Sequence, residues 1–184
     1  MKKPLLIVVL LLVALGILFF LNKESVEKNV ASVYKSEEFG IEFSYPKNYF
    51  VGFEESFSGE RSQHFVVLAE DSQENRDVFS GKSPDREGPP TITVAIYQNN
   101  LDNYTAKSFI EGTNFSNFKL SDDKLAEVSV GGENGLRYHS TGLYENENMV
   151  IARSDFVYMF TVFYLTPTDQ IVSDFEKMLE TIKF

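Results

Sequence analysis

One stretch of the chain decides the fold: Phe156-Val157-Tyr158-Met159-Phe160-Thr161-Val162-Phe163-Tyr164-Leu165. It is nearly all apolar and rich in β-branched and aromatic side chains, which favour strands. A strand that lacks polar alternation is one that is covered on both faces. The stretch therefore predicts the central strand of a sheet, and covering both faces of that strand requires helices.

The residues that follow this strand predict one of these helices. Thr166-Pro167-Thr168-Asp169 is a typical helix start, with Thr166 as the expected N-cap and Pro167 at the first helical position. The apolar residues beyond it recur at the spacing of one helix face: Ile171, Val172, Phe175, Met178, Leu179 and Ile182. This stripe predicts a helix that packs on the core of the protein and does not bind a cofactor.

Shorter stretches on the N-terminal side of this strand predict the rest of the sheet. Alternation of apolar and polar residues indicates half-buried strands. Strands are expected over residues 41–45, 49–53, 63–70, 91–97, 124–130, 136–144 and 148–153. A short helix is expected over 104–111, with Asp102 or Asn103 as its N-cap and Gly112 at its end.

Three turns are expected among the later strands. Gly131-Gly132-Glu133-Asn134-Gly135 predicts the connection of a β-hairpin. It does not match a phosphate-binding loop, because no helix follows it and no Gly-Lys-Ser/Thr ending is present. Residues 145–147 and 154–155 are expected to be the turns of an antiparallel meander that ends in the central strand.

The N-terminal region predicts the location of the protein. Pro4 to Leu21 is a run of apolar residues without a charge, and Lys2 and Lys3 precede it. A helix of that length spans about 27 Å at about 1.5 Å per residue, close to the bilayer's hydrocarbon core of about 30 Å. The two lysines predict a cytoplasmic N-terminus. A cleaved signal peptide is the alternative, although its apolar core is shorter, at about 7 to 15 residues.

These observations divide the chain into four parts. Residues 1–3 are expected to be a cytoplasmic stub, 4–21 a transmembrane signal-anchor, 22–32 a polar spacer, and 33–184 an extracytoplasmic domain. The protein is therefore expected at the cell membrane, with a single span and its C-terminal domain outside.

Composition excludes several classes of function. The formal net charge is −10 at pH 7, which opposes binding to nucleic acid and to anionic lipid head groups. Such a surface is compatible with basic partners or cations, or it serves solubility beside a negative membrane. The chain contains no cysteine, which excludes disulfides, thiolate metal sites and cysteine nucleophiles.

No catalytic, cofactor-binding or metal-binding residue is assigned from the sequence. The only histidines are His64 and His139, and each is expected to be a strand residue. They form no helix-spaced pair for zinc, and no Gly-x-Ser-x-Gly motif is present. A hydrolase whose site has one of these histidines beside a serine and a carboxylate remains an alternative.

The longest segment expected to be irregular is 71–90. Loops of this length are either functional or disordered. Its carboxylates do not have the spacing of a calcium loop. They are Asp71, Glu74, Asp77, Asp85 and Glu87. An ion- or small-ligand-binding module that uses this loop is the second alternative.

Both ends of the expected domain resemble a known family. Tyr34, followed by Phe39-Gly40-Ile41-Glu42-Phe43-Ser44-Tyr45-Pro46, resembles the opening of PsbP-like domains. Phe175-Glu176-Lys177-Met178-Leu179-Glu180-Thr181-Ile182-Lys183-Phe184 resembles their closing helix. Between them, Val128-Ser129-Val130-Gly131-Gly132-Glu133-Asn134-Gly135 has their order of strand, glycine turn and strand. The resemblance covers residues 33–184.

The resemblance implies an α+β fold, in which a central antiparallel sheet lies between helical layers as an α/β/α sandwich. Here one transmembrane helix would precede it. The family's best-known members are extrinsic subunits of the photosynthetic oxygen-evolving complex, and a structural relative is a nuclear-transport factor that binds a small GTPase. Both act by binding a larger assembly, and the family brings no catalytic motif to this chain. Membrane-tethered bacterial relatives are the nearer analogy.

The leading hypothesis follows from these points together. We expect a membrane-anchored, non-catalytic, extracytoplasmic domain that contacts the lipid bilayer through its N-terminal helix. Its partner is expected to be a protein or a membrane assembly, and no cofactor is expected.

Overall fold

A computed structural model describes residues 31–59, 61–83, 85–122 and 124–184. Ala31–Phe184 is one compact unit. The expected stub at 1–3, the signal-anchor at 4–21 and residues 22–30 of the spacer lie outside the described residues. Within the described part of the chain, no helix has the length and apolar character needed to cross a membrane.

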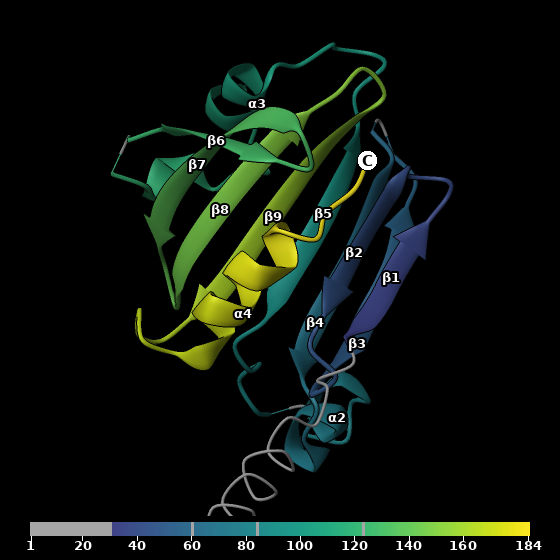
Figure 1. Cartoon of the computed structure of the whole chain (residues 1–184). Coiled ribbons are helices and arrows are strands. Elements are labelled where there is room, and N and C mark those ends of the chain that lie inside the picture. The colour runs from purple at the N-terminus through teal and green to yellow at the C-terminus, as the bar shows by residue number, and fades with distance from the viewer. Residues whose placement is uncertain (1–30, 60, 84, 123) are drawn as a thin grey trace, which may run out of the picture. The chain divides into compact units, whose positions relative to one another are not determined.

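A seven-stranded sheet dominates the described domain (Figure 1). Its strand order is β3-β4-β5-β9-β8-β7-β6, and every neighbouring pair is antiparallel. The strands are β3 (Tyr49–Phe57), β4 (Gln63–Glu70), β5 (Ile92–Gln98), β6 (Ala126–Val130), β7 (Glu133–Thr141), β8 (Glu145–Ala152) and β9 (Phe156–Tyr164). Strand β9 lies in the middle of this order and is largely buried, which confirms the central strand predicted from its apolar sequence.

The first face of the sheet is covered by a helix and a hairpin. Helix α4 (Gln170–Leu179) contacts β9 and β2, and Figure 1 shows it lying across the sheet beside the hairpin. That hairpin is formed by β1 (Ser32–Ser36) and β2 (Ile41–Tyr45). The core of this face includes Phe43, Val94, Phe160 and Phe175, all fully buried.

The second face of the sheet is covered only in part. Helix α3 (Ala106–Gly112) contacts β7 and β8, and the 3₁₀ helix η1 (Phe118–Leu120) contacts β7. Phe109 of α3 packs here with Tyr97, Val150 and Val157. The fold is therefore α+β with a large antiparallel sheet, as expected, but its second helical layer is short.

The hairpin β1–β2 is joined to the C-terminal residues. Glu42 and Lys183 exchange both backbone hydrogen bonds, at 2.9 and 2.8 Å. The Ser44 amide donates to Thr181 Oγ1 at 2.8 Å, and the Tyr158 hydroxyl donates to the Phe39 carbonyl at 2.7 Å. These bonds place residues 41–45 beside the end of the chain described here.

Two helices begin later than the sequence predicts. Helix α3 has Thr105 as its N-cap, with a capping box to Ser108, so the prediction of Asp102 or Asn103 was wrong. Helix α4 begins at Gln170 with Asp169 as N-cap, and Thr166 is not the cap. The Asp169 carboxylate accepts hydrogen bonds from the amides of Leu165 and Thr166, and these bonds hold Thr166 in a turn before the helix.

Three other expected boundaries also differ. The predicted turn at 145–147 lies in β8, because Glu145 pairs with Tyr164, and the turn is at 142–144. Strand β3 continues to Phe57 beyond a bulge near Gly52. The segment 71–90 contains helix α2 (Gln73–Phe79), whose N-cap Ser72 accepts a hydrogen bond from the Asn75 amide. The expected hairpin after β6 is confirmed, with its turn at Gly131 and Gly132.

Candidate functional site

His64 is buried at the place where the hairpin β1–β2 packs on the seven-stranded sheet. Its Nδ1 is 2.8 Å from Ser56 Oγ, and its Nε2 is 3.1 Å from the Tyr34 hydroxyl. Tyr34 donates to Glu54 Oε1 at 3.0 Å, and the Phe39 ring stacks on the imidazole at 4.4 Å. Burial lowers the pKa of His64, and the charges of Glu54 and Glu38 oppose that change.

This cluster places a serine and a carboxylate beside a histidine, as the hydrolase alternative requires. A hydrolase also needs a hollow for its substrate and donors for an oxyanion. None of the hollows described below is lined by Ser56 or His64. The geometry instead satisfies the hydrogen bonds of a buried histidine that ties Tyr34 of β1 to β3 and β4.

His139 lies in a second, more exposed network on the first face. Its Nε2 is 2.8 Å from Glu145 and its Nδ1 is 3.2 Å from Glu147. Arg137 bonds to Glu147 at 2.9 Å and to Glu176 of α4 at 2.7 Å. The network joins β7 and β8 to α4. Within the described ranges, no group of three or more His, Asp or Glu side chains is arranged to hold a metal ion.

The carboxylates of segment 71–90 are largely paired with basic side chains. Asp71 Oδ1 accepts from Arg76 Nε at 2.6 Å, and Asp77 lies 3.6 Å from Lys82. Glu74 pairs with Arg86. The Arg76 hydrogen bond lowers the pKa of Asp71. These pairs fold the segment around α2, and they occupy three of the groups proposed as cation ligands.

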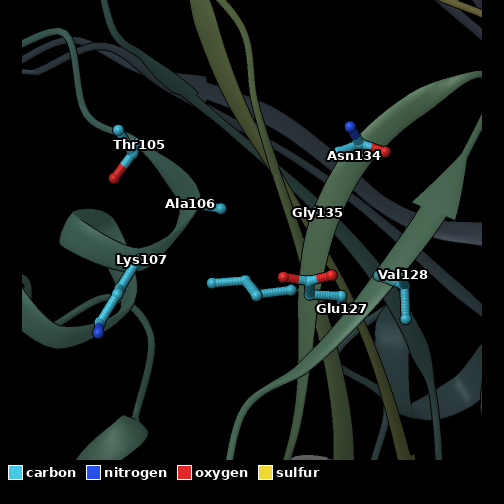
Figure 2. A pocket seen from close by; sticks show the side chains of 8 residues that line it. Thr105, Ala106, Lys107, Glu127, Val128, Asn134 and Gly135 are labelled. Carbon is cyan, nitrogen blue, oxygen red and sulfur yellow. The ribbon is translucent and has the colours of Figure 1, made fainter.

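A groove lies between α3 and the β6–β7 hairpin (Figure 2). Its volume is about 380 Å³, and Lys107 of α3 and Glu127 of β6 come from opposite walls. Gly135 of β7 also lines the groove. A Cβ at this position would collide with Val150 and Ile151 of β8, so no larger residue fits. A second hollow of about 380 Å³ shares three lining residues with the first and extends the groove to Arg153.

A larger hollow of about 710 Å³ lies at the far end of α3. Arg61 is in its wall, paired with Asp102 and stacked 4.9 Å over the Tyr104 ring. Leu101 and Phe115 also line it, and both are exposed apolar side chains.

Beside this hollow, the second face of the sheet carries a chain of aromatic rings. We call Phe53, Phe57, Phe65 and Phe115 the aromatic surface. The ring centroids of Phe53 and Phe57 are 6.4 Å apart, those of Phe57 and Phe65 are 5.9 Å apart, and the chain continues through Tyr97 to Phe115. Phe53 is 38% exposed, Phe57 44% and Phe115 37%.

Sequence reasoning missed the aromatic surface. The spacing of Phe53 and Phe57, with Glu55 between them, places all three on one side of a strand. That alternation could have been found. The strand was expected to end at Phe53, however, and which part of the sheet helices leave uncovered is a property of the tertiary fold.

Comparison with known proteins finds similar solved structures but no similar sequence. No family model and no curated protein matches the sequence. The chain is similar to the solution structure of cyanobacterial PsbP (CyanoP) from Synechocystis sp. PCC 6803. The TM-score is 0.49 with 14% identity, covering 85% of this chain and 94% of that one.

A crystal structure from Bacteroides thetaiotaomicron is also similar, with a TM-score of 0.44 and 10% identity. The likeness covers 82% of this chain and 47% of that one, so this chain spans about half its length. At such identities both likenesses concern the fold alone.

Proposed function

We propose that the protein is a membrane-anchored, non-catalytic domain that binds a protein partner on the outer side of a cell membrane. The aromatic surface carries this proposal. Large apolar groups that gather on an exposed face mark interaction sites in soluble domains, whereas single exposed apolar residues need no explanation. Aromatic residues are also the groups that most often supply the binding energy of protein interfaces.

The surroundings of the two histidines and of the aromatic surface support a binding role over a catalytic one. Each histidine is held by neighbouring side chains in a network that connects three elements of the fold. The rings of Phe53, Phe57 and Phe65, by contrast, lie on β3 and β4, where helix α2 contacts only the start of β3. The expected signal-anchor at 4–21 and the short spacer after it would keep this surface near the membrane.

Chemical crosslinking of the intact protein in its native membranes tests the proposal. We expect a discrete crosslinked species heavier than the monomer, with a yield at least about tenfold lower in the double variant Phe53→Ser, Phe57→Ser. The double variant Leu143→Ser, Leu165→Ser is the matched control, because both leucines are exposed elsewhere in the fold. Recovery of monomer alone from the unaltered protein would refute partner binding.

A further inference from the structure

Helices cover the second face of the sheet unevenly. Helix α2 contacts only the start of β3, where Phe79 lies against Phe50, and Phe109 of α3 reaches Tyr97 of β5. Helix α3 covers β7 and β8. On β4, His64, Val66 and Leu68 point to the first face and are buried, whereas Phe65 and Val67 point to the second face and are partly exposed. No helix among the described residues contacts β4 on this side in the way that α3 contacts β8. Apolar sheet faces are normally covered by a second layer.

The uncovered part of this face is continuous with a hollow. The rings of the aromatic surface run from β3 across β4 and β5 to Phe115, which lines the hollow of about 710 Å³. A rod-like apolar element fits this strip better than a small ligand, because the strip crosses several strands and the hollow lies only at one end. A helix is one of the elements that cover the apolar face of a sheet, and α3 already covers part of this face.

The charge of Glu55 indicates which kind of molecule could bind to the aromatic surface. Glu55 lies between Phe53 and Phe57 on the same side of β3, and its side chain is exposed. No basic side chain of the described residues lies within ion-pair distance of Glu55. A second copy would bring the same glutamate, on a chain whose net charge is also −10. An anionic lipid surface would be repelled in the same way.

We infer that the aromatic surface receives an amphipathic helix of a protein partner, with an apolar side on the rings and a Lys or Arg beside Glu55. The inference rests on the proposed function and adds the chemistry of the partner. The bound helix lies next to α3 and completes the second helical layer.

Site-specific photocrosslinking in the intact protein, in its native membranes, tests this inference. A photoreactive phenylalanine analogue replaces Phe57 in one variant and Leu143 in another, and the crosslinked segment is sequenced by mass spectrometry. We expect Phe57 to capture a segment with apolar residues at helical spacing and a basic residue on its flank. We expect Leu143 not to capture this segment.

The charge reversal Glu55→Lys should lower the Phe57 crosslink about fivefold, as for loss of one partly exposed ion pair. Replacing the captured segment's basic residue by Glu should restore it. Glu127→Lys, on the opposite edge strand, is the matched control and should have no effect. A lipid, a second copy or an acidic segment at Phe57 would overturn the inference. If a protein is captured at Leu143 but not at Phe57, the inference about the aromatic surface fails, while the proposal that the domain binds a protein partner remains.

Discussion

At the scale of single residues, the buried side chain of His64 connects strands β1, β3 and β4 through its hydrogen bonds. The Tyr34 hydroxyl donates to Glu54, so it accepts from His64 Nε2, and Nδ1 then accepts from the Ser56 hydroxyl. The neutral imidazole thus has both nitrogens satisfied. Burial disfavours the charged form, and it is the main reason that the pKa of His64 lies below its ordinary value of 6.5.

A pH dependence of stability follows from this shift. A histidine whose pKa is lowered by folding binds fewer protons in the folded state than in the unfolded state. Its contribution is therefore fully present above pH 6.5 and is lost as the pH falls through the folded-state pKa. We expect urea midpoints to fall less between pH 7 and pH 5 in His64→Gln than in the unaltered protein.

The imidazole can also be observed directly. Its NMR titration midpoint should lie below 6.5, and Phe39→Ala should raise it, because removing the stacked ring admits water. Parallel stability curves for His64→Gln and the unaltered protein, together with a midpoint at or above 6.5, would contradict this account.

At the scale of elements, the hairpin β1–β2 depends on residues beyond α4. Ile182 is buried in the same core as Ile41 and Phe43. The next residue, Lys183, forms the two backbone bonds to Glu42. The side chain of Ile182 therefore holds in place the segment that pairs with β2.

The variant Ile182→Ala should weaken this attachment. Loss of a buried isoleucine side chain costs about 2 to 5 kcal/mol. We expect the urea midpoint to fall, and the Glu42 and Ser44 amides to exchange with solvent faster. Glu180→Ala is the control, because this exposed side chain can be removed while the backbone bonds of Lys183 and its ion pair with Glu42 remain. Unchanged protection of both amides in Ile182→Ala would show that the hairpin is held by other contacts.

The sequence predicts elements well where local pattern and tertiary environment agree. The apolar run of β9, the alternation in β2 and the part of the α4 stripe from Ile171 to Leu179 are found where expected. The closing helix was expected to continue to Phe184, but α4 ends at Leu179, because Lys183 pairs with Glu42 of β2. The errors of the sequence-based prediction concern the ends of helices and strands. Asp169 bonds backward to the amides of Leu165 and Thr166, and this competes with a helix start at Thr166.

The candidate interaction surface could be predicted only in part. The order of Phe53, Glu55 and Phe57 is visible in the sequence. Their exposure depends on α3 covering β7 and β8 and not β3 and β4, which is decided by contacts between distant segments. Local patterns do not contain that information.

At the scale of the whole molecule, the proposed anchor would hold the domain close to a membrane. Pro4 to Leu21 has the length and apolar character expected of a membrane span, and a domain held near a membrane would meet membrane-bound partners at a raised effective concentration. This advantage exists only if the segment is not cleaved.

Membrane fractionation checks the anchor. We expect the intact chain to stay with membranes after an alkaline carbonate wash, and a variant lacking residues 4–21 to be soluble. Protease added outside spheroplasts should digest the domain, because Lys2 and Lys3 predict a cytoplasmic N-terminus. A shortened, soluble product of the intact chain would mean cleavage, and the proposal would then reduce to an exported binding domain.

The backbone pairing of Glu42 with Lys183 also has a consequence for biosynthesis. The two residues are 141 positions apart in the chain. At about 5 to 20 residues per second, roughly 7 to 30 seconds separate their synthesis. During that interval Ile41 and Phe43 cannot be enclosed, and they remain open to chaperones or to association with other nascent chains. The pairing of β2 with Lys183 therefore cannot form until the last residues of the domain have been made.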